Sequence, residues 1–293
     1  MINVPIIDAY RPLSYAWNYI IPLGCMHMES KAFDVMAYRR TIREGLAMGA
    51  SFVLLGDNGD FILPGDRKRY RQSNIVKALA GKDNQIEHTI CYQYDLLRPI
   101  KGHIAAVLMG NHEEACLHFH EVDPAAELAE RLGVPYLGMF GAIRWHTMRR
   151  DGKSGGTMLH VLHHGAWVSK AAMPQAAVDW FTKNTPQADI ITFAHNHTES
   201  PVPIPCFDFP RQGASATKRL RYIVACGTMR ENYSSEPGDA PGYDVVKGMG
   251  VTAIGAPLIA WRRKNLCGGE GHRRVKNRAA GIPSDWIEIR VTI

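Results

Sequence analysis

The sequence predicts an α/β protein, in which buried strands alternate with helices. Two observations carry this prediction. Five short apolar runs recur in the first 200 residues, and each ends in polar residues of the kinds that bind metals or substrates. Apolar residues at helical spacing lie between several of these runs. Because α/β proteins carry their sites on loops at one edge of a sheet, the repeated pattern predicts one shared site.

The first expected strand is the apolar run 19–23, which Cys25 and His27 follow closely. A helix is expected next, with Ser30 as its N-cap and Gly49 at its end. Its apolar positions recur three or four residues apart, at Val35, Tyr38, Ile42 and Leu46.

Four further apolar runs repeat the pattern of a strand followed by polar residues. They span residues 51–57, 104–109, 157–162 and 189–194. The polar residues at or just after their ends are Asp57 and Asp60, Asn111 and His112, His163 and His164, and His195 and His197. Chance placement would not put such side chains at the end of every run, so we interpret them as one constellation.

The remaining chain is expected to complete a single domain, residues 1–293. Residues 62–103 interrupt the strand rhythm and look mostly helical. Their Lys and Arg residues outnumber Asp and Glu eight to four between 63 and 103, so this stretch is interpreted as a basic insertion near the mouth of the site. From about residue 220 the chain is strand-like, with Gly and Pro between the strands.

Composition sets the broad class. The chain has 293 residues, 46% of them hydrophobic and 21% charged, and no apolar run approaches the roughly 20 residues of a membrane-spanning helix. The N-terminus does not read as a signal peptide, so a cytoplasmic protein is expected. Six scattered cysteines without a C-x-x-C pair predict free thiols. The net charge of +6 is compatible with phosphate-bearing partners and with ordinary surface charge.

The residues at the strand ends combine a thiol, carboxylates, an amide and several imidazoles. Such a mixed set of sulfur, oxygen and nitrogen ligands suits a transition metal, namely zinc, iron or manganese. The set is too large for one tetrahedral ion. We therefore expect two divalent ions close together, which in enzymes clamp a phosphoryl group during displacement.

Four blocks in this order resemble the calcineurin-like metallophosphoesterase superfamily: GDNGD (56–60), GNHE (110–113), HHG (163–165) and AHNH (194–197). The match spans about residues 20–200. The resemblance implies two packed β-sheets flanked by helices, a four-layer α/β/β/α sandwich. It also implies hydrolysis of a phosphomonoester or phosphodiester, with two metal ions and a metal-held hydroxide as the attacking group.

The resemblance also implies a role for each site residue. Asp57 would bridge both metals, and His112 would assist the leaving oxygen as an acid or hydrogen-bond donor, which makes these two the expected catalytic residues. Asp60, Glu113 and His164 would lie behind the ligands, the first two orienting imidazoles. The ligands would be His27 and His197 for the first metal, and Asn111, His163 and His195 for the second. His163 is preferred to His164 because the superfamily places this ligand one residue ahead of the turn.

Cys25 departs from the superfamily pattern, because it stands where D-x-H has its Asp. As a thiolate it would ligate the first metal and favour zinc or iron over manganese. As a small buried thiol it would leave that metal loosely held. The second interpretation supports an alternative function, a catalytically weakened member of the superfamily that acts as a binding scaffold.

Two basic clusters, residues 67–72 and 262–278, are either solvated loops or a rim that binds a polyanionic substrate such as nucleic acid. In the first cluster, Arg67 and Arg69 are the expected substrate-binding residues. The sequence indicates neither the substrate itself nor the oligomeric state, and it predicts no membrane partner.

Overall fold

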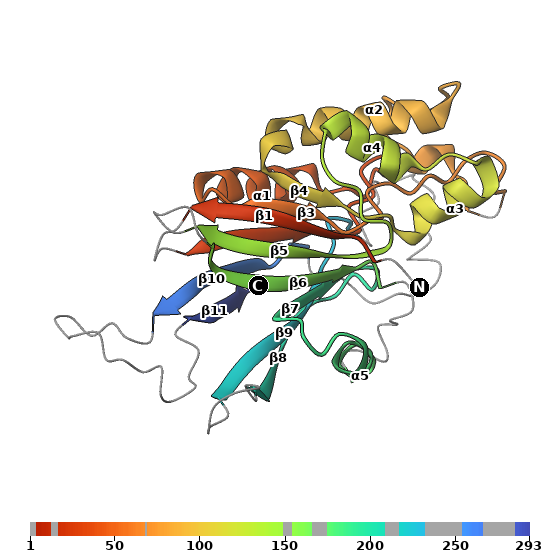
Figure 1. Cartoon of the computed structure of the whole chain (residues 1–293). Helices are drawn as coiled ribbons and strands as arrows, with labels where there is room; N and C mark the ends of the chain where they lie inside the picture. The colour runs from red at the N-terminus through yellow and green to blue at the C-terminus, as the bar shows by residue number, and fades with distance from the viewer. Residues whose placement is uncertain are drawn as a thin grey trace.

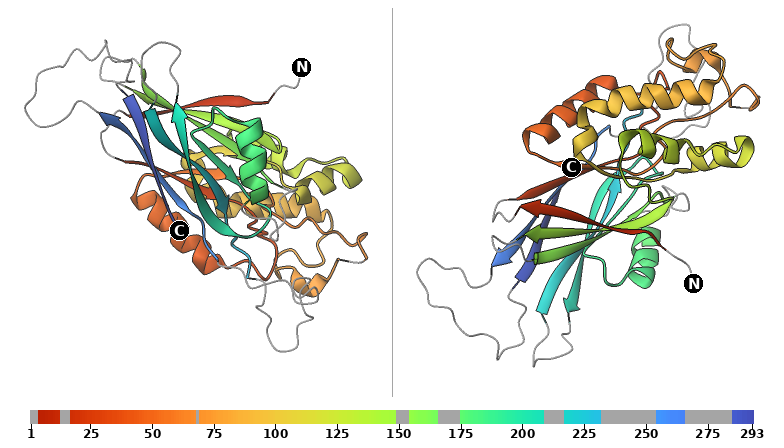
Figure 2. Two further views of the ribbon diagram at one scale, coloured as in Figure 1. Left: turned by 90° about the horizontal axis from the view of Figure 1, so that it is seen from below. Right: turned by 45° about the horizontal axis from the view of Figure 1, so that its top comes forward.

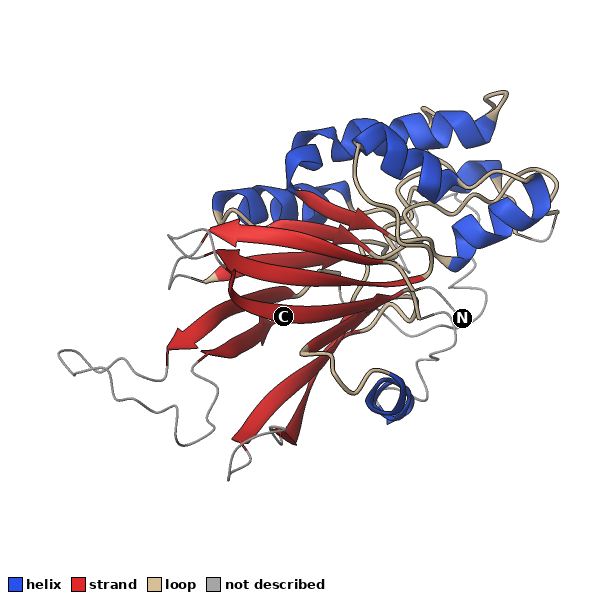
Figure 3. Ribbon diagram, viewed as in Figure 1, coloured by secondary structure: helices blue, strands red, loops and turns tan. Residues whose placement is uncertain are grey.

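The protein consists of two β-sheets packed face to face, with helices on both outer faces (Figure 1, Figure 3). This computed structural model describes residues 4–12, 17–67, 69–148, 154–165, 175–208, 217–231, 254–265 and 285–293. The predicted α/β architecture of two packed sheets flanked by helices is confirmed.

The first sheet has five strands in the order β11-β10-β2-β3-β4. Its strands β2, β3 and β4 run parallel to one another, whereas β10 is antiparallel to both β2 and β11. In chain order the bounds are β2 (Asn18–Leu23), β3 (Ser51–Leu54), β4 (Ile104–Val107), β10 (Leu258–Asn265) and β11 (Asp285–Thr292). The three parallel strands therefore end at the same edge of the sheet.

The second sheet has six strands in the order β1-β5-β6-β7-β9-β8. Its strands β6, β7 and β9 run parallel to one another. The antiparallel pairs are β5 with β6 and β8 with β9. The bounds are β1 (Ile6–Pro12), β5 (Phe140–Met148), β6 (Ser154–His163), β7 (Ile190–Phe193), β8 (Glu199–Asp208) and β9 (Thr217–Cys226).

Helices cover the outer face of each sheet. Among the described residues, α1 to α4 gather on the side of the five-stranded sheet, and α5 lies on the other side (Figure 1, Figure 2). Their bounds are α1 (Val35–Ala47), α2 (Gln85–Leu97), α3 (Asn111–His120), α4 (Pro124–Leu132) and α5 (Gln175–Asn184). The 3₁₀ helices η1 (Gln72–Asn74) and η2 (Arg98–His103) flank α2. No helix in the described part of the chain has both the length and the apolar character needed to cross a membrane.

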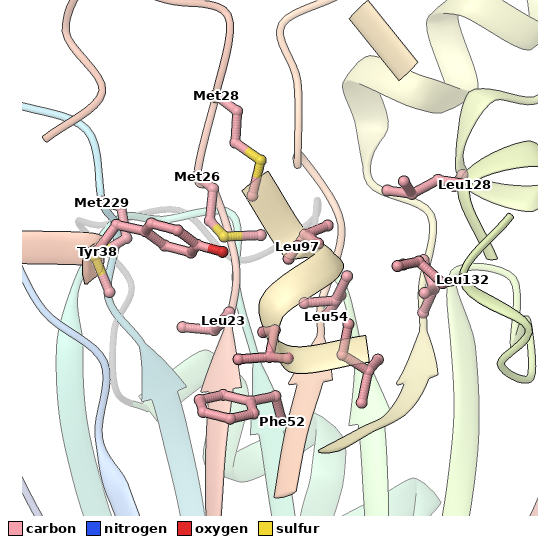
Figure 4. Packing of buried hydrophobic residues seen from close by; sticks show 14 of the residues in the cluster. Leu23, Met26, Met28, Tyr38, Phe52, Leu54, Leu97, Leu128, Leu132 and Met229 are labelled. Carbon is pink, nitrogen blue, oxygen red and sulfur yellow. The ribbon is translucent and has the colours of Figure 1, made fainter. Parts of the chain in front are cut away.

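Three buried apolar clusters join the layers. The first lies between the five-stranded sheet and its helices, and Figure 4 shows Leu54 of β3 beside Leu97 of α2. The second fills the space between the sheets and contains Trp145 of β5 and Trp261 of β10, both fully buried. The third lies under α5, whose Phe181 contacts the outer face of the six-stranded sheet. Burial of these side chains supplies the main driving force for bringing the sheets together.

The structure differs from the sequence predictions in some elements. The N-cap of α1 is Asp34, whose carboxylate accepts hydrogen bonds from the Met36 and Ala37 amides, and not Ser30. In residues 62–103 helix occupies mainly the second half, where α2 connects the parallel strands β3 and β4. This helix belongs to the layer that covers the sheet, as crossover helices between parallel strands usually do.

Candidate metal centre

The predicted site residues follow the carboxyl ends of parallel strands from both sheets. Cys25 and His27 follow β2, Asp57 and Asp60 follow β3, and Asn111 begins α3 soon after β4. In the six-stranded sheet, His164 follows β6 directly, and His195 and His197 follow β7. The loops that carry these residues gather at one end of the two sheets (Figure 3). Parallel strands thus bring residues that are distant in sequence to one edge.

The loops after β2 and β3 run side by side and are joined by backbone hydrogen bonds. The amides of Cys25 and His27 donate to the carbonyls of Gly56 and Asp57 at 3.0 and 3.1 Å. Cys25, His27 and Asp57 all have φ close to +50°, and His195 and His197 also have positive φ. This left-handed conformation costs a non-glycine residue roughly 1–2 kcal/mol. Such strain persists only where the surroundings enforce it, and it concentrates at functional sites.

Two glycines allow the strand ends of β3 and β4 to approach closely. Gly56 has φ of +84°, and a Cβ on it would lie 2.3 Å from the Gly110 amide nitrogen. A Cβ on Gly110 would lie 2.2 Å from the amide nitrogen and from Oδ1 of Asp57. The glycines of the GDNGD and GNHE blocks are therefore required by the close packing of Asp57 against the start of α3.

Glu113 holds these two strand ends together. Its carboxylate accepts backbone hydrogen bonds from Asp57, Asn58 and Gly110 at 2.8–2.9 Å, and its side chain is buried. Burial, together with the negative charge of Asp57, raises the pKa of Glu113. The expectation that Glu113 orients an imidazole is not met, because its oxygens face backbone amides.

The first group of metal-ligand side chains consists of Cys25, His27 and His197, whose ligand atoms lie within 4.8 Å of one another. His27 Nδ1 donates to Asp60 Oδ1 at 2.7 Å, so the other ring nitrogen, Nε2, is left without a proton in the neutral ring. That nitrogen faces His197 Nε2 at 3.3 Å. Burial first, then the charge of Asp57, raises the pKa of the Cys25 thiol well above its usual value.

The second group consists of Asp57, His164 and His195, again within 4.8 Å, and Asn111 joins it. His164 Nδ1 donates to the Leu55 carbonyl at 2.7 Å. Its Nε2 faces Asn111 Oδ1 at 3.0 Å and Asp57 Oδ2 at 3.2 Å. His195 Nδ1 lies 2.7 Å from the same Asn111 oxygen. Although burial opposes ionisation of Asp57, the neighbouring His164 and His112 hold the pKa of Asp57 well below its usual value.

Both groups fit a metal ion. Two nitrogens bound to zinc at about 2.0–2.1 Å in tetrahedral geometry lie about 3.3 Å apart, which is the His27–His197 separation. At His164, Nε2 faces two oxygen acceptors, so a proton or a metal cation is needed between them. Metal-binding histidines usually donate their second ring nitrogen to a carboxylate or carbonyl. His27 and His164 do so, to Asp60 and Leu55.

The structure brings His164 into this cluster in place of His163. Along β6 successive side chains point to opposite faces, so Leu162 and His164 share the inner face while Val161 and His163 share the outer one. The His163 ring lies against Phe140, Trp180 and Phe181, at centroid distances of 5.2–6.4 Å. The alternation in the run 157–164 was the sequence signal that indicates His164.

His112 lies beside the first group, and with His27 and Asp60 it forms a third set of possible ligand atoms within 4.8 Å of one another. Its Nδ1 donates to the Asp60 carbonyl at 2.7 Å, which fixes the ring and leaves Nε2 for other contacts. Burial alone would lower the pKa of His112, but the charges of Asp57 and Asp60 outweigh it and raise that pKa. The side chain is 18% exposed, so it is reachable from solvent.

The basic clusters are described only in part. Arg67 and Arg69 are exposed on the loop after β3, where Arg69 Nε pairs with Asp66 at 2.5 Å. In the second cluster, residues 266–278 lie outside the described residues.

One residue beside the site was not predicted. Arg230 follows β9, which pairs in parallel with β7, and its Nη1 lies 3.7 Å from Asp60 Oδ1. The chain is strand-like from about residue 220, and a charged residue just after that strand was the signal that could have found Arg230.

No protein-family model and no curated protein matches the sequence. Among solved structures, Vps29 from Entamoeba histolytica, complexed with zinc, is 12% identical with a TM-score of 0.36. Vacuolar Protein Sorting 29 from Cryptosporidium parvum is 10% identical with a TM-score of 0.35, and both matches cover 94% of this chain and 98% of the other. A predicted phosphoesterase from Streptococcus pneumoniae TIGR4 is 11% identical with a TM-score of 0.31, covering 75% and 78% of the two chains.

The structure itself places the GDNGD, GNHE and AHNH blocks at the ends of parallel strands in two packed sheets. In its fold and in the order of these motifs, the chain is similar to the calcineurin-like metallophosphoesterases.

Proposed function

We propose that this protein is a metal-dependent phosphoesterase that hydrolyses a phosphomonoester or phosphodiester. The observation that carries the proposal is that two ligand groups from both sheets lie side by side, and in them His27 and His164 each fix Nδ1 by a hydrogen bond and direct Nε2 to further donor atoms. Cys25, His27 and His197 would hold one divalent ion. Asn111, His164 and His195 would hold the other, and Asp57 would bridge the two.

Bound divalent ions would supply Lewis acidity, which activates water and neutralises the charge of a phosphoryl group. The protein's own residues prepare the site for this chemistry. Asp57 stays ionised because His164 and His112 keep its pKa low. His112 is held by the Asp60 carbonyl and its pKa is raised, which favours a proton that Nε2 would donate to the leaving oxygen.

A second candidate function, a binding scaffold, rests on Cys25. Its Sγ accepts a hydrogen bond from the His195 amide at 3.1 Å, and its raised pKa favours the neutral thiol when no metal is bound. A neutral thiol would leave the first ligand group weak. Metal binding would instead remove the thiol proton and keep the negative charge that Asp supplies in the superfamily pattern.

The metal content of the purified protein, measured by elemental mass spectrometry, separates the two functions. We expect nearly two equivalents of zinc, iron or manganese in the wild type and about one in Cys25→Ala. Cys25→Asp is expected to regain the second equivalent, to keep or raise activity, and to shift the metal preference toward manganese. One equivalent or less in both the wild type and Cys25→Ala would favour the scaffold.

A hydrolysis assay of the metal-loaded protein then tests the reaction. It should include a phosphomonoester, a phosphodiester and single-stranded DNA, because the exposed Arg67 and Arg69 are proposed to bind a polyanionic substrate. Binding of DNA that weakens steeply as salt is added would support nucleic acid as the substrate. Absence of DNA binding at low salt would remove that proposal. A fully metal-loaded protein that hydrolyses none of these esters would contradict the proposed reaction.

A further inference from the structure

The carboxyl end of β9 lies at the same edge as the metal centre, because β9 pairs in parallel with β7. The residues that follow β9 are tied to the loop that carries Cys25. Thr228 Oγ1 donates to the Cys25 carbonyl at 2.7 Å, and both residues are fully buried. The loop after β9 is therefore part of the wall of this site.

The main chain around Arg230 is held on both sides. Its amide donates to Thr228 Oγ1 at 3.1 Å, and the residue forms an isolated β-bridge with Phe33. The adjacent amide of Glu231 donates to the Ala32 carbonyl at 2.8 Å. A side chain carried by such a segment starts from a fixed backbone position, which lowers the entropic cost of ordering it around a ligand.

The Arg230 guanidinium is one of three basic side chains that lie close to the Asp60 carboxylate. Asp60 Oδ1 is 2.7 Å from His27 Nδ1, 3.7 Å from Arg230 Nη1 and 3.9 Å from His112 Nδ1. The Arg230 side chain is 16% exposed, so it is largely buried but reachable. The guanidinium thus lies beside His27, a proposed ligand, and His112, the proposed proton donor.

A permanent positive charge at this place is unfavourable once cations bind next to it. Like charges in a poorly solvated site repel one another. An arriving oxyanion removes this conflict. The guanidinium is also the side chain whose planar set of N–H donors best matches two oxygens of a phosphate.

We propose that Arg230 binds a phosphoryl oxygen of the substrate at the metal centre. This inference rests on the proposed function, since it assigns the ligand of the same site. It defines the recognised group as a tetrahedral oxyanion bound between the metal ligands and the loop after β9. Arg230 acts in binding and in stabilising charge on the phosphoryl oxygens, while His112 acts on the leaving oxygen.

Titration calorimetry with inorganic phosphate on the metal-loaded protein tests this assignment. We compare the wild type with Arg230→Gln and Arg230→Lys, and measure the metal content of each sample. The control is Arg290→Gln, which removes the same charge from an exposed position on the edge strand β11. Arg230→Gln should weaken phosphate binding about tenfold to a hundredfold, as expected for a lost charged hydrogen bond. The phosphate affinity of Arg230→Lys should lie between those of the wild type and Arg230→Gln. Arg290→Gln should bind phosphate as tightly as the wild type.

Phosphate affinity unchanged in Arg230→Gln, or absent in the metal-loaded wild type, would overturn the assignment. Loss of metal from both Arg230 variants would also overturn it, because Arg230 would then support the metal ligands. The proposed function fails separately. A wild type that binds phosphate through Arg230 but hydrolyses no ester would contradict the reaction and leave the oxyanion site standing. If Arg230→Gln hydrolysed an ester with the kcat/KM of the wild type, the proposed reaction would stand and the assignment of Arg230 would be contradicted.

Discussion

At the scale of single residues, hydrogen bonds decide which ring nitrogens are available for binding. His27 and His164 each use Nδ1 as a donor, to Asp60 and to the Leu55 carbonyl, and so present Nε2 to the centre. His163 instead accepts a hydrogen bond at Nδ1 from the Gly165 amide at 2.8 Å. Two adjacent histidines therefore have different chemistry, because the strand directs their side chains to opposite faces.

Replacing His164 or His163 by alanine should distinguish a metal ligand from a residue that only packs against its neighbours. We expect His164→Ala to lose about one metal equivalent, because the second ligand group loses its central nitrogen. His163→Ala should keep the metal content of the wild type and lose stability, since its ring packs under α5 against Trp180 and Phe181. Elemental analysis and urea unfolding of both variants check this. Metal loss in His163→Ala with full content in His164→Ala would contradict the assignment.

At the scale of elements, the site depends on how closely the ends of β3 and β4 approach. Gly56 and Gly110 permit the approach, and Glu113 at the start of α3 holds it with backbone hydrogen bonds. The carboxylate accepts at both oxygens, so it satisfies amides that would otherwise be buried without partners. This one side chain connects the loop that carries Asp57 to the helix that carries Asn111 and His112.

Replacement of Glu113 by glutamine should weaken this connection. Glutamine has one accepting oxygen, and its NH₂ group would face backbone N–H donors. We expect a loss of about 1–3 kcal/mol in the free energy of unfolding, measured by urea denaturation. Glu114→Gln is the matched control, because Glu114 is exposed on the same helix turn. A stability of Glu113→Gln equal to that of the control would show that the carboxylate does not hold the two loops.

At the scale of the whole molecule, the sheets bury polar groups that must remain neutral. His160 lies in β6 between Trp145 and Thr192, with Trp145 Nε1 donating to its Nδ1 at 3.3 Å and its Nε2 at 2.6 Å from Thr192 Oγ1. Burial lowers the pKa of His160 to about 3. In the unfolded chain the pKa of a histidine is about 6.5, so between these values the unfolded state binds the additional proton.

Stability should therefore fall as the pH decreases below about 6.5. For a group whose pKa is depressed in the folded state, the stabilisation is complete above the unfolded pKa and is lost toward the folded one. Between pH 7.5 and pH 5, His160 alone should cost about 2 kcal/mol. The glutamine of His160→Gln can make the same two hydrogen bonds but does not titrate. The free energy of unfolding of this variant should therefore fall by about 2 kcal/mol less than that of the wild type between pH 7.5 and pH 5. Urea unfolding in EDTA measures the difference, with His118→Gln on the exposed end of α3 as control. If the free energy of unfolding changed with pH equally in the wild type and in His160→Gln, the loss of stability at low pH would not come from His160.

Much of the fold and of the ligand set follows from local sequence. The apolar runs and the polar residues that end them predict the strands β2, β3, β4, β6 and β7 and the side chains that these strands carry. The helical spacing in residues 35–46 predicts α1. These features depend on period and on short-range turn chemistry, which single stretches of chain contain.

Other features arise only when the two sheets pack together. The role of Glu113 requires the ends of β3 and β4 to meet, and the place of Arg230 requires β9 to lie parallel to β7. Asp60 lies close to His27, His112 and Arg230, which come from the loop after β2, the start of α3 and the loop after β9. The amino-acid sequence thus determines by itself which ligand-type residues are present and in which order they occur. Which of them face one another is decided by long-range strand pairing, because that pairing sets the distances between residues up to 203 positions apart.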